Sequence, residues 1–347
     1  MTGRSRLGLV AGATCVALGL WLGFGPIHAA FGGAFTLNYK PLPLSSADLK
    51  EKQVGALLYR GGIEITSPEG RFGGWSGLLV SADGSHMLSQ SDEGHWLRAK
   101  LVYDTRGNLN GITGGQLADM EAADGSKLAP KLEADAEGLA ALSDKGPDGP
   151  VAISFERDAR IWRYDVRGSL DVAPTEILAP KQIRTLDFNS GLEGLTRFSS
   201  DILFTVAETP QVRGSDHPAW LVPISGSAKG RPFAELGVIH HEPYEISDAA
   251  MSPDNRELYL LERHYFGPVR GVVGAVRRIE ASDVKAGARL EGNEIAKFTM
   301  HENIDNMEGM ALRRDAGGHT LLYMISDDNY NLVLQRTVLL MFEVTDR

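Results

Sequence analysis

The sequence predicts an all-β fold, a β-propeller of five four-stranded blades, and three observations support this. A short phrase, Glu-Gly-Leu or a close variant, recurs along the chain at nearly regular intervals. Short apolar or alternating stretches bounded by turn residues follow each copy, as in β-strands. One further strand precedes the first copy and is available to complete the last repeat. A regular period of this kind is typical of folds that copy one supersecondary unit.

The recurring phrase sets the number of repeats. Taking Gly77, Gly138, Gly194, Ala249 and Gly309 as equivalent gives intervals of 61, 56, 55 and 60 residues. The copies are Glu137-Gly138-Leu139, Glu193-Gly194-Leu195 and Glu308-Gly309-Met310, with weaker ones at Ser76-Gly77-Leu78 and Ser247-Asp248-Ala249. We therefore expect five blades. A six-bladed ring would need another repeat that lacks the phrase.

The strands expected after each phrase can be placed in chain order. They lie at 78–80, 87–93 and 96–104, then 151–157 and 160–165, then 202–208 and 219–224, then 257–263 and 276–279, and finally 321–328 and 338–344. Units two to four each end with one more short strand, at 176–178, 235–239 and 294–298. Four antiparallel strands per unit make a propeller blade.

The last unit lacks a fourth strand, because the sequence stops soon after Val344. An unassigned strand at 55–60 lies just before the first phrase. We expect this N-terminal strand to complete the last blade and close the ring, since closure removes exposed sheet edges.

Three segments are expected along the chain: residues 1–30 as a signal peptide or N-terminal anchor, 31–53 as an extended lead-in, and 54–347 as the propeller domain. Arg4 and Arg6 precede an uncharged apolar run at 7–24, which is typical of an export signal. We expect cleavage and a periplasmic or secreted protein; an uncleaved segment anchoring it to the inner membrane is the alternative. The one cysteine, Cys15, lies in this run, so a cleaved chain has no thiol for disulfides or metal binding.

The chain is acidic, with 35 Lys and Arg residues against 45 Asp and Glu residues and a net charge of −10. Such a surface is a poor partner for nucleic acid. It suits divalent cations, or a substrate presented through them, although a solvated acidic surface is the simpler explanation. The sequence leaves the oligomeric state open.

The acids of the phrase are the first candidate site. The innermost strand of each blade lines the central channel, so Glu137, Glu193, Asp248 and Glu308 are expected at similar heights around one mouth. Carboxylates that share a funnel repel one another unless a cation is shared, and Ca²⁺ takes six to eight oxygen ligands. The alternative is that each acid accepts backbone N–H bonds from the neighbouring blade and only holds the ring together.

A second acidic set ends the next strand of each blade and is the candidate substrate-binding set. Its members are Asp92, Glu156, Glu262 and Asp327; Glu208 stands at the equivalent position of the third unit without an assigned role. Arg157 and Arg263 follow two of these acids, and an arginine beside a carboxylate can clamp an anionic substrate. We expect both arginines to stabilise developing negative charge, with His264 or one of the acids carrying a proton. Pairing across blades is the alternative for each residue.

The succession of motifs resembles a known family. The motifs are Phe72-Gly73-Gly74-Trp75-Ser76-Gly77-Leu78, Ser91-Asp92-Glu93-Gly94, Glu137-Gly138-Leu139, Ser154-Phe155-Glu156-Arg157, Gly191-Leu192-Glu193-Gly194-Leu195, Asn306-Met307-Glu308-Gly309-Met310 and Ser326-Asp327-Asp328-Asn329-Tyr330. Over roughly Val54 to Val344 they look like the bacterial phytase-like domain family, also called esterase-like proteins of the phytase family. The resemblance implies an exported propeller with hydrolytic activity on phosphoric or other esters.

Two function classes follow. The first is a hydrolase of a small-molecule ester in which Ca²⁺ assists attack by water; it predicts that the phrase acids cluster around a cation. The second is a non-catalytic propeller that binds a small ligand or a protein partner; it predicts that hydrogen bonds between blades occupy all of these acids.

Overall fold

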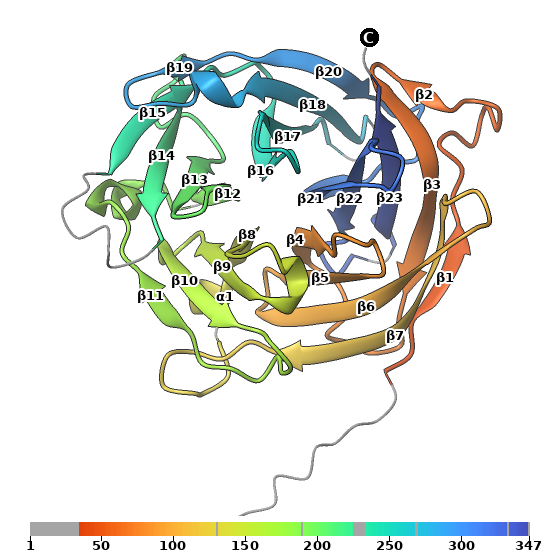
Figure 1. Ribbon diagram of the computed structural model, residues 1–347, viewed down its shortest axis with the longest axis horizontal. Helices are drawn as coiled ribbons and strands as arrows, with labels where there is room; N and C mark the ends of the chain where they lie inside the picture. The colour runs from red at the N-terminus through yellow and green to blue at the C-terminus, as the bar shows by residue number, and fades with distance from the viewer. Residues whose placement is uncertain are drawn as a thin grey trace, which may run out of the picture. The chain divides into compact units, whose positions relative to one another are not determined.

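The computed structural model describes residues 35–129, 131–188, 190–224, 233–267, 270–331 and 333–345. These residues form five small, mainly antiparallel sheets arranged in a ring, a five-bladed β-propeller (Figure 1). The predicted fold class and blade number are confirmed. The expected export segment at 1–30, with Cys15, lies outside the described residues. Among the described helices, none has the length and apolar character needed to cross a bilayer.

The first three blades follow one another along the chain. Blade one contains β4 (Trp75–Val80), β5 (His86–Ser91), β6 (His95–Tyr103) and β7 (Leu109–Asp119). Blade two contains β8 (Ala136–Ala141), β9 (Pro150–Phe155), β10 (Arg160–Asp165) and β11 (Thr175–Ile177). Blade three contains β12 (Leu192–Ser199), β13 (Ile202–Ala207), β14 (His217–Pro223), β15 (Ala234–Val238) and the added β19 (Arg289–Leu290).

The last two blades use the rest of the chain and its N-terminal strands. Blade four contains β16 (Glu245–Met251), β17 (Glu257–Tyr265), β18 (Val272–Glu280) and β20 (Asn293–Phe298). Blade five contains β21 (Asn306–Arg314), β22 (Thr320–Asp327), β23 (Thr337–Val344), β3 (Leu57–Thr66), β1 (Asn38–Pro41) and β2 (Gln53–Val54). β3 pairs antiparallel with β23, from Leu57 opposite Val344 to Ile65 opposite Thr337. The predicted ring closure is therefore confirmed.

The described helices are short. They are α1 (Lys131–Ala134), η1 (Gly146–Asp148), η2 (Lys181–Thr185) and η4 (Ala281–Asp283). The core instead lies between the faces of neighbouring blades. The Trp96 ring of blade one meets the Tyr164 ring of blade two edge-on at 5.4 Å, and both side chains are fully buried. Phe342 of blade five packs likewise on Phe298 of blade four at 5.6 Å.

The innermost strands, β4, β8, β12, β16 and β21, surround the centre of the ring (Figure 1). Each has an irregularity in its pairing at the recurring phrase. A β-bulge leaves a residue out of the ladder and re-aims its side chain. In blades one, three, four and five the unpaired residues are Ser76, Glu193, Ser247 and Glu308; in blade two the irregularity spans Glu137 and Gly138.

Candidate functional site

A funnel of about 740 Å³ opens at the mouth of the ring where these bulges lie. We call it the central funnel. Ten acidic side chains line it: Asp92, Asp135, Glu137, Glu156, Glu193, Glu208, Glu302, Asp305, Glu308 and Asp327. The basic residues lining its described part are Lys131, Arg157, Arg263 and Arg336. Acid outnumbers base in this enclosed space, so the funnel is strongly electronegative.

Two positions of each blade deliver most of these side chains. The bulge on the inner strand contributes Glu137, Glu193 and Glu308, with Ser76 in blade one. A residue at or near the end of the second strand contributes the other set: Asp92, Glu156, Glu208, Arg263 and Asp327. In blade three, for example, Leu192 pairs with Ala207, so the next residues, Glu193 and Glu208, emerge together at the mouth.

Blade four departs from the sequence-based prediction by one residue. Ile246 pairs with Glu262, and the bulge falls on Ser247. Successive residues of a strand face opposite sides, so a shift of one position exchanges the two faces. Ser247 therefore takes the bulge position that was predicted for Asp248, and Arg263 lines the funnel in the place predicted for Glu262.

The prediction that Asp248 and Glu262 face the funnel is wrong. Asp248 is 1% exposed and accepts the N–H groups of Ala249 and Met310, both at 2.7 Å. Glu262 is 2% exposed and pairs with the buried Arg277 at 2.5 Å. Both acids are structural in this fold.

His264 also lies away from the funnel. Its ring stacks edge-on against Phe266 at 4.4 Å, and it is absent from the residues that line the funnel. It follows Arg263 directly on β17, so the two side chains point to opposite faces of the strand. This geometry removes the support for His264 as a proton carrier.

Two groups of three carboxylates stand close enough to share a cation. Asp135, Glu137 and Glu156 form one group, and Glu156, Glu193 and Glu208 form the other. Within each group the ligand oxygens all lie within 4.8 Å of one another. We call the five residues the carboxylate cluster. Oxygens on opposite sides of a Ca²⁺ ion are about 5 Å apart, because each Ca²⁺–O distance is about 2.3–2.6 Å.

Sequence reasoning did not identify Asp135 and left Glu208 without an assigned role. Asp135 stands two residues before Glu137, and residues at that spacing on a strand share a face. This spacing is the sequence signal from which Asp135 could have been predicted to face the funnel. The short helix α1 leads into Asp135 and brings Lys131 to the same side of the funnel.

Burial and mutual repulsion raise the pKa values of the cluster. The pKa of Asp135 rises to about 7, chiefly because of burial and then because of the neighbouring Glu156. Burial also raises the pKa of Glu208 to about 7. The pKa values of Glu137 and Glu193 lie well above their usual range, first through burial and then through the negative charge of neighbouring carboxylates.

Basic side chains satisfy only part of this cluster. Arg263 Nη2 lies 3.3 Å from Glu208 Oε1, and Arg263 Nε lies 2.9 Å from Glu308 Oε1. Arg157 Nε lies 2.9 Å from Asp135 Oδ2. Within the described part of the chain, the carboxylates of Glu137 and Glu193 have no hydrogen bond or ion pair. Interblade bonding therefore accounts for Asp248 but not for these two acids.

The donor set fits a hard divalent cation. Every side chain of the cluster offers carboxylate oxygens, the ligands that Ca²⁺ prefers. Asp92 Oδ1, also in the funnel, is buried without a hydrogen-bond partner. An unsatisfied buried oxygen of this kind is stabilised when a cation or a proton reaches it.

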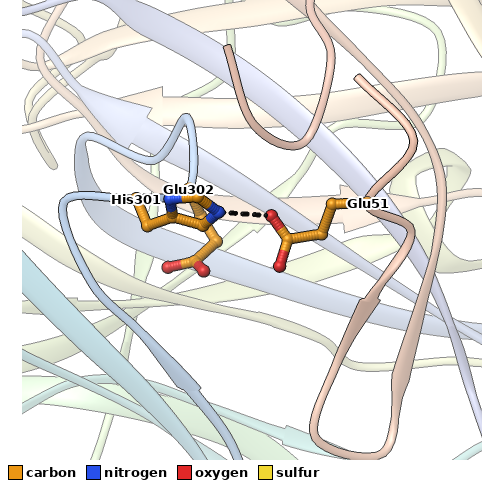
Figure 2. Close-up of side chains that lie close together, drawn as sticks. All are labelled: Glu51, His301 and Glu302. Atoms are coloured by element: carbon orange, nitrogen blue, oxygen red, sulfur yellow. Dashed lines mark ion pairs between the residues drawn. The ribbon is translucent and has the colours of Figure 1, made fainter. Parts of the chain in front are cut away.

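A separate cluster lies at the edge of the funnel, in the loop after β20. His301 Nε2 lies 2.9 Å from Glu51 Oε2 of the lead-in, and Glu302 stands beside the imidazole (Figure 2). The same loop is held by Asn303, whose N–H donates to Leu44 O at 2.6 Å and whose Nδ2 donates to Pro43 O at 2.9 Å. The lead-in thus fixes this part of the rim.

Comparison with known proteins identifies a family. Residues 70–330 match the family described as "Phytase-like: Esterase-like activity of phytase". No curated protein sequence matches the chain.

The solved structures that match share little sequence with this chain. Phage phi92 endosialidase is 9% identical with a TM-score of 0.40, over 93% of this chain and 60% of the endosialidase. The Cps50 (Swd1) β-propeller domain of Myceliophteria thermophila is 11% identical with a TM-score of 0.41, over 88% of this chain and 99% of that domain. This chain thus spans less than two thirds of the endosialidase.

Proposed function

Since the chain belongs to the phytase-like family described by an esterase-like activity, we propose that it hydrolyses anionic esters with the help of a Ca²⁺-type cation in the central funnel. One observation carries the proposal. Each of the two groups in the carboxylate cluster has its ligand oxygens within 4.8 Å of one another, and two of the acids, Glu137 and Glu193, have no protein partner among the described residues. Such an arrangement is unfavourable at neutral pH unless positive charge is added.

Glu156, Glu193 and Glu208 are the residues that would hold the cation, with Asp135 and Glu137 of the other group beside them. When bound, a divalent cation neutralises the carboxylates and acts as a Lewis acid toward an ester oxygen. A cation held there would also lower the pKa of the neighbouring Asp135 and so favour its ionised form.

The chain's own side chains then have distinct roles. Asp135 accepts a proton from the attacking water as the water oxygen bonds to the ester phosphorus or carbonyl carbon. Arg263 and Arg157 stand in the funnel to stabilise the negative charge that develops on the ester oxygens. The bond to the alcohol breaks, and the alcohol leaves with the proton returned by the acid.

The proposal is tested on the full chain and its Glu193→Gln variant. Calorimetry measures Ca²⁺ binding, and turnover is followed on p-nitrophenyl phosphate, phytate and p-nitrophenyl acetate with and without Ca²⁺. We expect Ca²⁺-dependent hydrolysis of at least one of the two anionic esters, p-nitrophenyl phosphate and phytate; the neutral p-nitrophenyl acetate is the comparison. We also expect at least a tenfold loss of Ca²⁺ affinity in the variant, about the size of effect seen when a metal site is perturbed.

The matched control is Glu176→Gln, which removes an exposed carboxylate outside the funnel. It should change neither Ca²⁺ affinity nor turnover. Unchanged Ca²⁺ binding by Glu193→Gln would contradict the assigned cation site. Ca²⁺ binding without turnover on any ester would instead favour the non-catalytic, ligand-binding propeller.

A further inference from the structure

One arc of the central funnel's rim is apolar although its floor is acidic. We call Tyr265, Val272, Met300 and Leu334 the apolar arc; all four line the funnel. Tyr265, Met300 and Leu334 are 52%, 63% and 69% exposed. Large apolar side chains that gather on an exposed surface beside a polar site often mark a place where a ligand binds.

The arc occupies only one side of the rim. Tyr265 ends β17 and Val272 begins β18, both in blade four, while Met300 follows β20 and Leu334 lies between β22 and β23. Lys131 and Arg157, which also line the funnel, come instead from the segments beside blade two. The exposed apolar side chains of the funnel's described part all belong to the arc's side, where Arg263, Glu302 and Arg336 stand among them, so a ligand bound there would meet apolar and charged groups together.

Local packing holds Met300 in the arc. Gly271 has a φ of +62°, and a Cβ there would lie 2.1 Å from Met300 Sδ, so the thioether fills the space that the missing side chain leaves. The next residue, His301, pairs with Glu51 of the lead-in at 2.9 Å (Figure 2). Met300 is thus positioned by the hairpin on one side and by the lead-in on the other.

The turn that carries Leu334 is also defined. Leu334 N donates to Asn331 O at 3.0 Å, and Arg336 Nε lies 3.4 Å from Asp305 Oδ2. Its neighbour Val333 is 91% exposed but does not line the funnel. Adjacent residues of one turn therefore differ in whether they face the site.

We propose that the substrate of this site is amphiphilic: an anionic ester group sits over the carboxylate cluster, and an alkyl or aryl group lies on the apolar arc. This inference rests on the proposed function and deepens it. An apolar group gains about fourfold in affinity for each methylene that leaves water. A polyanion without apolar parts, such as phytate, would leave Met300 and Leu334 in water and gain nothing from them.

The test measures binding as well as turnover. Calorimetry with the full chain in Ca²⁺ buffer compares methyl, butyl and octyl phosphate, each below the concentration at which it self-associates. We expect octyl phosphate to bind at least tenfold more tightly than methyl phosphate. Leu334→Ser and Met300→Ser should each reduce that ratio several-fold.

The controls are Val333→Ser, in the same turn but outside the funnel, and Leu178→Ser, where a 70% exposed leucine lies away from it. Both should retain the full dependence on chain length. Equal affinities for methyl and octyl phosphate, or an equal loss in Val333→Ser and Leu334→Ser, would overturn the inference. So would a failure of all three phosphates to bind.

The same experiment separates the inference from the proposed function. If p-nitrophenyl phosphate is hydrolysed but the affinity for alkyl phosphates does not depend on their chain length, only the amphiphilic substrate is overturned. Binding that depends on chain length and on Leu334, without turnover of any ester, would support the apolar arc and contradict the hydrolase.

Discussion

At the scale of single residues, the same chemical group has opposite roles in this ring, depending on one position in the strand. Glu193 lies at a bulge and faces other carboxylates in the funnel, and burial with their repulsion raises its pKa. Asp248 lies one residue past a bulge and turns toward backbone N–H groups. A cation suits the first environment, whereas the second is already satisfied by hydrogen bonds.

A buried histidine makes the fold sensitive to acid. His217 is fully buried; its Nδ1 lies 3.3 Å from Ala207 O, and its ring meets the His240 ring at 4.9 Å. Burial, with a contribution from His240 and Arg277, lowers the pKa of His217 to about 3. Between about pH 6.5 and 3 the unfolded chain binds the proton that the folded chain excludes, so stability falls as the pH falls through this range.

We predict that His217→Gln weakens this pH dependence. The wild-type free energy of unfolding should fall by up to about 1.4 kcal/mol more per pH unit below 6.5 than that of the variant. Thermal or urea unfolding between pH 7 and 4 gives the free energy of unfolding of each protein. Subtracting the variant's value from that of the wild type removes the contribution of the titrating groups that the two proteins share. His86→Gln, at a partly exposed histidine, is the control. Parallel pH profiles for wild type and His217→Gln would contradict the assignment.

At the scale of the elements, side chains near the bulges join neighbouring blades. Ser154 Oγ of blade two donates to Leu192 O of blade three at 2.8 Å, and Ser247 Oγ of blade four donates to Met307 O of blade five at 3.0 Å. Asp248 of blade four also accepts the N–H of Met310 in blade five at 2.7 Å. The inner strands are thus held to one another by polar contacts as well as by the apolar layers.

Replacement of Asp248 tests this structural role. Asp248→Ala leaves the buried N–H groups of Ala249 and Met310 without their acceptor, so we predict a loss of about 2–4 kcal/mol in the free energy of unfolding. Denaturant unfolding gives this value, and Asp248→Asn, which keeps one acceptor oxygen, should lose less. Calorimetry on the folded Asp248→Asn protein should find unchanged Ca²⁺ affinity. A tenfold loss of affinity would restore Asp248 as a ligand.

At the scale of the whole propeller, the N-terminal strand closes the ring. β3 contributes four buried side chains to blade five: Leu57, Tyr59, Ile63 and Ile65. Each such side chain contributes about 1.5–3 kcal/mol when buried, so together they match the net stability of about 5–15 kcal/mol of a typical domain. Without β3, the edge of β23 would also be open to pairing with another chain.

We therefore predict that a chain of residues 67–347 does not form a stable monomer, whereas residues 35–347 does. The two differ by β1, β2 and β3 and by no other strand of the ring. Size-exclusion chromatography and circular dichroism compare them after identical purification. A cooperative, monomeric unfolding transition in the shorter chain would show that closure by β3 is dispensable.

The extent of sequence-based prediction differs between the fold and the site. Strand periodicity, the recurring phrase and the unassigned strand before it were enough to predict five blades and the way they close. In the site, the same reasoning brought Glu137, Glu193 and Glu308 to one funnel but placed blade four one residue out of register. An interval of 55 residues from Glu193 to Asp248 and one of 54 residues from Glu193 to Ser247 both fit the repeat. The local sequence does not show which of the two residues the bulge leaves unpaired.

The sequence by itself determined the architecture of this protein and the excess of acid at its centre, because both depend on patterns repeated in every blade. Only the tertiary structure decided which acids face one another, that Arg263 takes the place of an acid, and that Tyr265, Met300 and Leu334 meet on one side of the rim. The physical reason is that a side chain's direction on a strand depends on pairing register and bulge position. Hydrogen bonds between strands set both the register and the bulge position, and the sequence of one segment taken alone does not specify those bonds.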